Sequence, residues 1–171
     1  MNWNQLTYRF KSLSIAEKLM ALNGVFFVLP FVLQTIFYLF ELPISGLLSW
    51  FQLSADAELL LFRPWTLISY SFLHSGFFHL FWNMILLYYT GQLFLNLFPA
   101  RTFTNVYFMG VVLGGVLFVT SYALFPVFQG MRPYMVGASA GVMATFVFIS
   151  TYTPNQEVRF FFFNVKLKYL A

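Results

Sequence analysis

Apolar residues follow one another along most of this chain, in stretches that contain no charged side chain. A membrane-spanning helix needs about 20 such residues, and four of the stretches are long enough. Trimmed at proline and polar positions, they predict helices over 19–40, 78–98, 103–125 and 138–153. Another apolar pattern begins near Val165, where the sequence ends. We therefore expect an all-α, polytopic membrane protein of one domain, 1–171, with four complete transmembrane helices and the start of a fifth.

The segment 41–77 between the first two predicted helices is too apolar for an ordinary solvated loop. It contains Trp50 and Trp65, and Trp65 lies two residues after Arg63. Tryptophan beside arginine is typical of the headgroup layer of a membrane, where the indole ring stays apolar and its N–H stays wet. The sequence therefore predicts that 41–77 is an interfacial first loop.

The composition excludes most soluble folds. The 171 residues include 9 Lys and Arg, 5 Asp and Glu, and 25 Phe, so phenylalanine alone outnumbers all charged residues. In a soluble domain about a quarter of the residues are charged. The absence of cysteine from the sequence excludes disulfides, thiolate metal sites and a cysteine nucleophile within it.

The positions of the positive charges predict the orientation in the membrane. They are scattered between apolar stretches, which does not fit a nucleic-acid-binding face. With the N-terminus in the cytoplasm, two basic residues, Arg63 and Arg132, lie outside. The other seven lie inside, as the positive-inside rule requires: Arg9, Lys11, Lys18, Arg101, Arg159, Lys166 and Lys168. We expect a multi-pass protein whose segment 1–18 is cytoplasmic.

Three polar residues stand at the start of the second predicted helix: His74, His79 and Asn83. His79 and Asn83 are four residues apart and share one helical face. Polar side chains at membrane depth are costly unless they have a partner or a function. One interpretation is that the pair only bonds a neighbouring helix. A metal site is not expected, because two histidines without cysteines or acidic neighbours do not hold zinc.

A second candidate is the sequence Gly137-Ala138-Ser139-Ala140-Gly141. It matches the GxSxG pattern of hydrolases, but no strand precedes it, so an α/β-hydrolase is rejected. Its glycines also form a small-xxx-small face, which is typical of close helix packing. Ser139, His79 and Asn83 begin their helices from the same side of the membrane. Together they can stabilise an oxyanion, as acyl transfer requires, but an obvious base is lacking.

At these residues the sequence resembles the rhomboid family of intramembrane serine proteases, in particular its bacterial members. The likeness consists of Arg63-Pro64-Trp65, the HxxxxHxxxN arrangement of His74, His79 and Asn83, and the GxS motif that ends at Ser139. The resemblance implies that Ser139 is the nucleophile and that His79, Asn83 and Gly137 line the oxyanion and substrate site. His74 and Trp65 would be structural residues near it.

The resemblance also implies the setting and the chemistry. Members cleave transmembrane segments of other membrane proteins within the lipid bilayer, without metal or cofactor, and the location would be a bacterial inner membrane. The general base of the family is a histidine on a sixth helix. We therefore expect the sequence to be truncated before that helix and, as written, to be inactive. The alternative is an inactive rhomboid-like protein that binds transmembrane segments for quality control or trafficking. The oligomeric state and the substrate stay open.

Overall fold

The computed structural model describes residues 2–42, 46–160 and 163–169, and most of them are helical. The helices are α1 (Trp3–Ser12), α2 (Ile15–Leu39), α3 (Ala57–Phe62), α4 (Thr66–Ser69), α5 (Phe77–Leu97), α6 (Ala100–Leu124) and α7 (Ser139–Tyr152). Within these described residues there are also four short 3-10 helices, η1 (Leu48–Trp50), η2 (Tyr70–Phe72), η3 (Pro126–Phe128) and η4 (Leu167–Tyr169). The strands are β1 (Leu53–Ser54), β2 (Tyr134–Met135), β3 (Glu157–Phe160) and β4 (Phe163–Lys166).

The four long apolar stretches form the helices that their pattern predicts. Helices α2, α5, α6 and α7 correspond to the expected 19–40, 78–98, 103–125 and 138–153. The largest difference is that α2 begins at Ile15, one turn early. Ser14 and Glu17 form a capping box, in which the Ser14 N–H donates to Glu17 Oε2 (2.7 Å) and the Glu17 N–H donates to Ser14 Oγ (3.2 Å). A local cap therefore extends this helix beyond its apolar stretch.

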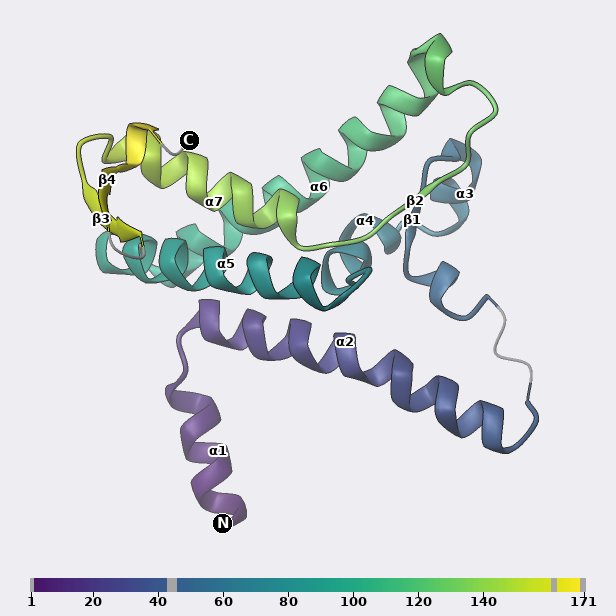
Figure 1. Ribbon diagram of the computed structural model, residues 1–171, viewed down its shortest axis with the longest axis horizontal. Helices are drawn as coiled ribbons and strands as arrows, with labels where there is room; N and C mark the ends of the chain where they lie inside the picture. The colour runs from purple at the N-terminus through teal and green to yellow at the C-terminus, as the bar shows by residue number, and fades with distance from the viewer. Residues whose placement is uncertain (1, 43–45, 161–162, 170–171) are drawn as a thin grey trace.

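Helix α7 packs against both α5 and α6, and α2 packs against α5 (Figure 1). Small residues let α6 and α7 approach closely, as their glycine pattern predicts. Gly110 faces Ala144, and a Cβ at Gly114 would lie 2.6 Å from the Ala140 Cβ. Because Ala140 follows Ser139 directly, this contact fixes the first turn of α7 against the middle of α6.

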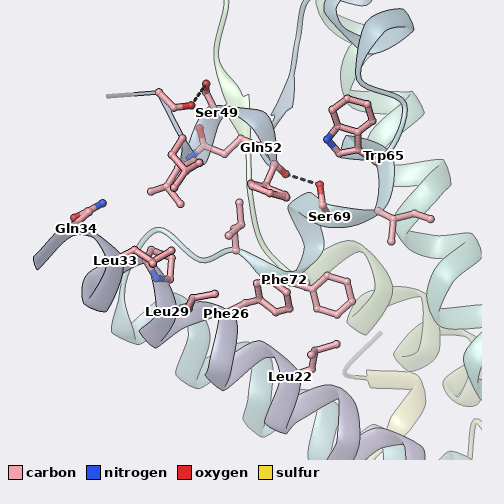
Figure 2. A pocket seen from close by; sticks show the side chains of 17 residues that line it. Leu22, Phe26, Leu29, Leu33, Gln34, Ser49, Gln52, Trp65, Ser69 and Phe72 are labelled. Carbon is pink, nitrogen blue, oxygen red and sulfur yellow. Dashed lines mark hydrogen bonds between the residues drawn. The ribbon is translucent and has the colours of Figure 1, made fainter. Parts of the chain in front are cut away.

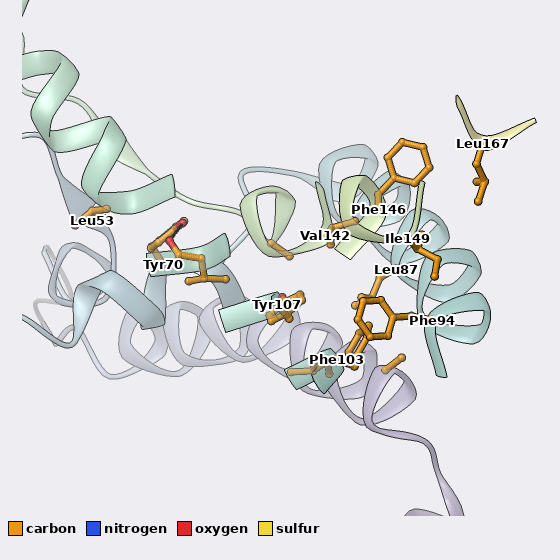
Figure 3. Close-up of a cluster of buried hydrophobic side chains, with 14 of the residues drawn as sticks. Leu53, Tyr70, Leu87, Phe94, Phe103, Tyr107, Val142, Phe146, Ile149 and Leu167 are labelled. Carbon is orange, nitrogen blue, oxygen red and sulfur yellow. Dashed lines mark hydrogen bonds between the residues drawn. The ribbon is translucent and has the colours of Figure 1, made fainter. Parts of the chain in front are cut away.

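The buried core lies where α5, α6 and α7 meet, and it is rich in aromatic rings (Figure 3). Phe94 and Phe103 are fully buried, with ring centroids 5.4 Å apart in an edge-to-face arrangement. Phe94 also stacks on Phe148 at 5.1 Å. Such aromatic pairs stabilise packing beyond the area that they bury. They hold the end of α7 that lies away from Ser139.

Two helices of the described part of the chain, α2 and α6, are long and apolar enough to cross a membrane. Only 11% and 22% of their most apolar windows are buried inside the protein, so most of this apolar surface faces outward. Outward apolar surface of this kind is typical of helices that contact lipid. Helix α5 contains polar residues, and α7 has 14 residues. Length and hydropathy therefore support two of the four predicted transmembrane helices.

The predicted start of a fifth helix near Val165 is wrong for the described residues. Strands β3 and β4 pair antiparallel there, with Glu157 opposite Lys166 and Phe160 opposite Phe163. Residues 167–169 then form η4. Phenylalanine and valine favour strands, so two short adjacent runs of them pair with each other instead of opening a helix. Residues 161–162 and 170–171 lie outside the described part.

The first loop is folded, not extended. Strand β1 pairs with β2, so that Leu53 lies opposite Met135, and the Ala55 N–H donates to the Pro133 carbonyl (3.0 Å). Asp56 and Arg132 form an ion pair beside this ladder (3.4 Å). The loop before α5 is therefore joined to the segment that leads into α7 and Ser139.

Candidate functional site

Ser139 is the first residue of α7, directly after a turn that requires glycine. Gly137 has φ +122°, a conformation that side chains rarely adopt. The first hydrogen bond of α7 runs from the Val142 N–H to the Ala138 carbonyl (3.0 Å). The N–H groups of residues 139–141 therefore have no acceptor within the helix. The Ser139 side chain is exposed, and in the described part of the chain its hydroxyl makes no hydrogen bond.

His79 lies against this turn from the first turn of α5. A Cβ at Gly137 would lie 2.6 Å from His79 Cε1 and 2.7 Å from His79 Nε2, so glycine is needed for the ring to approach. The hydroxyl of Ser75 lies 3.0 Å from His79 Nδ1 and fixes the ring on its other side. When that hydroxyl donates to Nδ1, Nε2 carries the proton and is free to donate. The structure thus brings His79 and Gly137 together.

Asn83 lies one turn further along α5 and is buried, with 8% of its surface exposed. Its Nδ2 donates to the backbone carbonyl of His79 (2.8 Å). Within residues 2–42, 46–160 and 163–169 no hydrogen bond joins Asn83 to Ser139. The amide is on the face of α5 that the spacing predicts, but it bonds its own helix.

His74 contacts the same turn from the loop before α5. Its Nε2 accepts a long hydrogen bond from the Ala138 N–H (3.4 Å), and its ring meets the His79 ring edge to face, with centroids 5.1 Å apart. Burial, together with the nearby His79, lowers the pKa of His74 from 6.5 to about 4. His74 is therefore a neutral acceptor at physiological pH. It supports the backbone beside Ser139 and makes no contact with the Ser139 hydroxyl.

Trp65 lies elsewhere, in the cluster that it forms with Trp50 and Arg63. The two indole rings are parallel, with centroids 6.4 Å apart, and Trp65 Nε1 donates to the Trp50 carbonyl (2.8 Å). The Arg63 guanidinium stacks on Trp50 at 4.0 Å. None of these contacts involves the residues around Ser139. The structure therefore does not bring Trp65 together with the other predicted site residues.

An apolar groove of about 1050 Å³ lies between α2 and the first loop (Figure 2). Leu22, Phe26 and Leu29 of α2 form one wall, and Trp65 lies on the other side. Phe72 of the first loop contacts Phe26, with ring centroids 5.7 Å apart. None of His74, His79, Asn83 and Ser139 lines it. The groove is thus separate from the histidine and serine residues of the candidate site.

Tyr70 is the residue that the sequence did not single out. It is fully buried, its carbonyl accepts the Gly137 N–H (3.0 Å), and its Oη donates to the Val111 carbonyl of α6 (2.7 Å). The sequence contains ten tyrosines, and neither spacing nor neighbours distinguish this one. As for metals, no group of three His, Asp or Glu side chains comes together among the described residues.

A comparison with protein families matches the part of the chain that contains the candidate site. A model described as the Rhomboid domain matches residues 61–171, which is more than half of the chain. The matched range includes His74, His79, Asn83 and Ser139. The comparisons with curated proteins and with solved structures gave no match. The chain belongs to the rhomboid family.

Proposed function

We propose that this protein is an intramembrane serine endopeptidase that cleaves transmembrane segments of other membrane proteins, with Ser139 as its nucleophile. The observation that carries the proposal is the position of Ser139 on the first turn of α7, beside unbonded N–H groups and next to the turn against which His79 packs. A hydroxyl beside preorganised donors is the arrangement that acyl transfer requires.

The groups of this site are assigned to the attack and to the oxyanion. The Ser139 Oγ gives its proton to the general base and attacks the scissile carbonyl carbon, and the carbonyl oxygen becomes an oxyanion. The C–N bond then breaks, the amine leaves with the proton from the base, and a water molecule releases the acyl group from Ser139. The Ser139 N–H and His79 Nε2–H donate to this oxyanion, and Asn83 lines the same wall. His74 keeps the Ala138 N–H occupied, so that the turn holds its shape. The proposal takes the general base, a histidine, from beyond Ala171.

The length of α7 supports a reaction inside the membrane. Its 14 residues rise about 21 Å, whereas the hydrocarbon core is about 30 Å thick. If the far end of α7 reaches one face, Ser139 lies several ångströms below the other. We propose that the chain crosses a bacterial inner membrane four times, through α2, through α5, through α6, and through α7 together with the segment before it. The N-terminus lies in the cytoplasm and 41–77 at the outer interface.

Cleavage of a reconstituted substrate tests the proposal. The full-length protein in proteoliposomes is mixed with a membrane protein that has a single transmembrane segment. We expect Ser139→Ala to abolish cleavage. Ser150→Ala is the matched control, because Ser150 lies on the same helix with a buried hydroxyl that has no partner in the described part, and it should cleave normally. Equal cleavage by Ser139→Ala and the unmodified protein would contradict the proposal.

One observation favours the alternative function, binding of transmembrane segments without cleavage. Neither histidine of the sequence hydrogen-bonds the Ser139 hydroxyl in the described part of the chain. The same proteoliposomes distinguish the two functions. A pure binding protein would retain the substrate in a pull-down, produce no cleavage, and respond equally to Ser139→Ala and Ser150→Ala.

A further inference from the structure

Tyr70 connects three parts of the molecule that surround the candidate nucleophile. It belongs to η2 of the first loop, and none of its surface is exposed (Figure 3). Its Oη donates to the Val111 carbonyl in the middle of α6 (2.7 Å). Its own carbonyl accepts the N–H of Gly137 (3.0 Å), two residues before Ser139. The first loop, α6 and the turn before α7 are thus linked through one residue.

Two glycines of α6 lie beside the phenol. A Cβ at Gly114 would lie 3.6 Å from the Tyr70 Oη, and a Cβ at Gly115 would lie 3.4 Å from its Cε1. Gly114 is also the residue against which Ala140 packs. Tyr70 and the first turn of α7 therefore rest on the same turn of α6. The phenol is thus connected to α7 both through Gly114 and through the Gly137 hydrogen bond.

We propose that Tyr70 is a positioning residue for Ser139. Its phenol fixes η2 to α6, and its carbonyl then sets the Gly137 turn, which determines where the Ser139 hydroxyl and N–H lie relative to His79. This inference rests on the proposed function and adds to it a residue that does not touch the substrate. Displacements of about 1 Å in an active site can lower a rate by about a hundredfold.

The chemistry of the contact suits this role. Burial raises the pKa of Tyr70 to about 12, so the phenol stays protonated and remains a donor at working pH. Val111 lies inside α6, and its carbonyl keeps its helical hydrogen bond when the phenol is removed. Tyr70→Phe therefore leaves no buried carbonyl without a partner, and we expect the variant to fold.

The test compares Tyr70→Phe with Tyr122→Phe in the full-length protein. Tyr122 is a half-buried tyrosine of α6 whose hydroxyl makes no hydrogen bond in the described residues. The measurements are the rate of fluorophosphonate labelling of Ser139, the end-point of labelling, and kcat and KM for a membrane substrate. The end-point counts the folded sites, so each rate is expressed per labelled molecule.

For Tyr70→Phe we expect the labelling rate and kcat to fall about tenfold or more, with KM changed less than about twofold. Tyr122→Phe should match the unmodified protein. An unchanged labelling rate per labelled molecule would overturn the inference. This holds also if the end-point of labelling falls, because Tyr70 would then act on folding alone. If the unmodified protein does not label at Ser139, the proposed function fails, and this inference fails with it.

Discussion

Gly137 combines a backbone conformation and a neighbour that both exclude a larger residue. Its φ is +122°, and the His79 ring occupies the place where a Cβ would stand. We expect Gly137→Ala to lower the free energy of unfolding by about 2–6 kcal/mol, the combined cost of backbone strain and overpacking. It should also slow labelling of Ser139, because the imidazole must move.

Gly130→Ala is the control for this substitution. Gly130 also has a positive φ, +81°, but a Cβ there would meet no atom within 4 Å. It should cost only about 1–2 kcal/mol, from the backbone alone. Chemical denaturation in detergent measures both variants. Equal losses would show that His79 does not occupy the space beside Gly137.

The low pKa of His74 predicts how stability depends on pH. Between about pH 6.5 and about pH 4 the unfolded chain takes up a proton at this residue and the folded chain does not. The contribution of His74 to the free energy of unfolding is therefore complete above this window and is lost as the pH falls through it. Protonation would also replace the acceptor of the Ala138 N–H with a donor.

We therefore expect the thermal midpoint in detergent to fall as the pH is lowered from 7 to about 4. The matched variant is His74→Gln, whose amide oxygen can accept the same N–H but does not titrate in this range. Its midpoint should fall less over the same interval. Parallel curves for the two proteins would mean that His74 takes up its proton equally in the folded and unfolded states.

For single residues of the candidate site, the sequence predicts which residue types occur better than it predicts which residues they contact. Spacing places His79 and Asn83 on one face of a helix, and a glycine before Ser139 agrees with the close approach of the His79 ring. It cannot find Tyr70, because that role depends on a carbonyl in α6 and on a backbone N–H 67 residues away. The sequence cannot predict the partners of Trp65 either, because they are set by how the loop folds.

Among the elements, α6 and α7 depend on small residues at their contact. Gly110 faces Ala144 so closely that a Cβ has no room. We expect Gly110→Ala to separate the helices and to lower stability by about 1–3 kcal/mol. It should also reduce labelling of Ser139, since the first turn of α7 rests on the same surface. Thermal denaturation, together with labelling, measures both effects.

Gly24→Ala is the matched control, because Gly24 is also helical but a Cβ there would meet nothing within 4 Å. It should be neutral or should stabilise α2 by up to about 1 kcal/mol, through helix propensity. If Gly110→Ala is as harmless as Gly24→Ala, the close packing of α6 on α7 is contradicted.

Long elements are predictable from the sequence, and short ones are not. A run of about 20 apolar residues leaves few alternatives to a helix, so α2, α5, α6 and α7 follow from the pattern. Strands β1 and β2 have two residues each, too few for a period, and their pairing is set by tertiary structure. An apolar start is common to a helix and a strand, so the sequence near Val165 does not distinguish the two.

For the whole molecule, the number of crossings determines on which side each loop lies. If α2, α5 and α6 all cross, Lys11 and Gln129 lie on opposite sides of the membrane. If α5 does not cross, the same two residues lie on one side. Since the sequence contains no cysteine, single-cysteine variants report the side directly.

We expect Gln129→Cys to react with an impermeant maleimide in intact cells, and Lys11→Cys to react only after the membrane is opened. Both positions are exposed in the structure, so reactivity reports topology and not burial. Labelling of both variants from the same side would reduce the crossings to those of α2 and α6 and would contradict the proposed four-helix arrangement.

A fluorophosphonate, which reacts with an activated serine, shows whether Ser139 is the nucleophile. The full-length protein is labelled in native membranes, its intact mass is measured, and the modified residue is located by peptide mapping, with Ser139→Ala and Ser150→Ala alongside. We expect one adduct, on Ser139, which is lost in Ser139→Ala and kept in Ser150→Ala. Absence of an adduct, or an adduct that survives in Ser139→Ala, would contradict this role of Ser139.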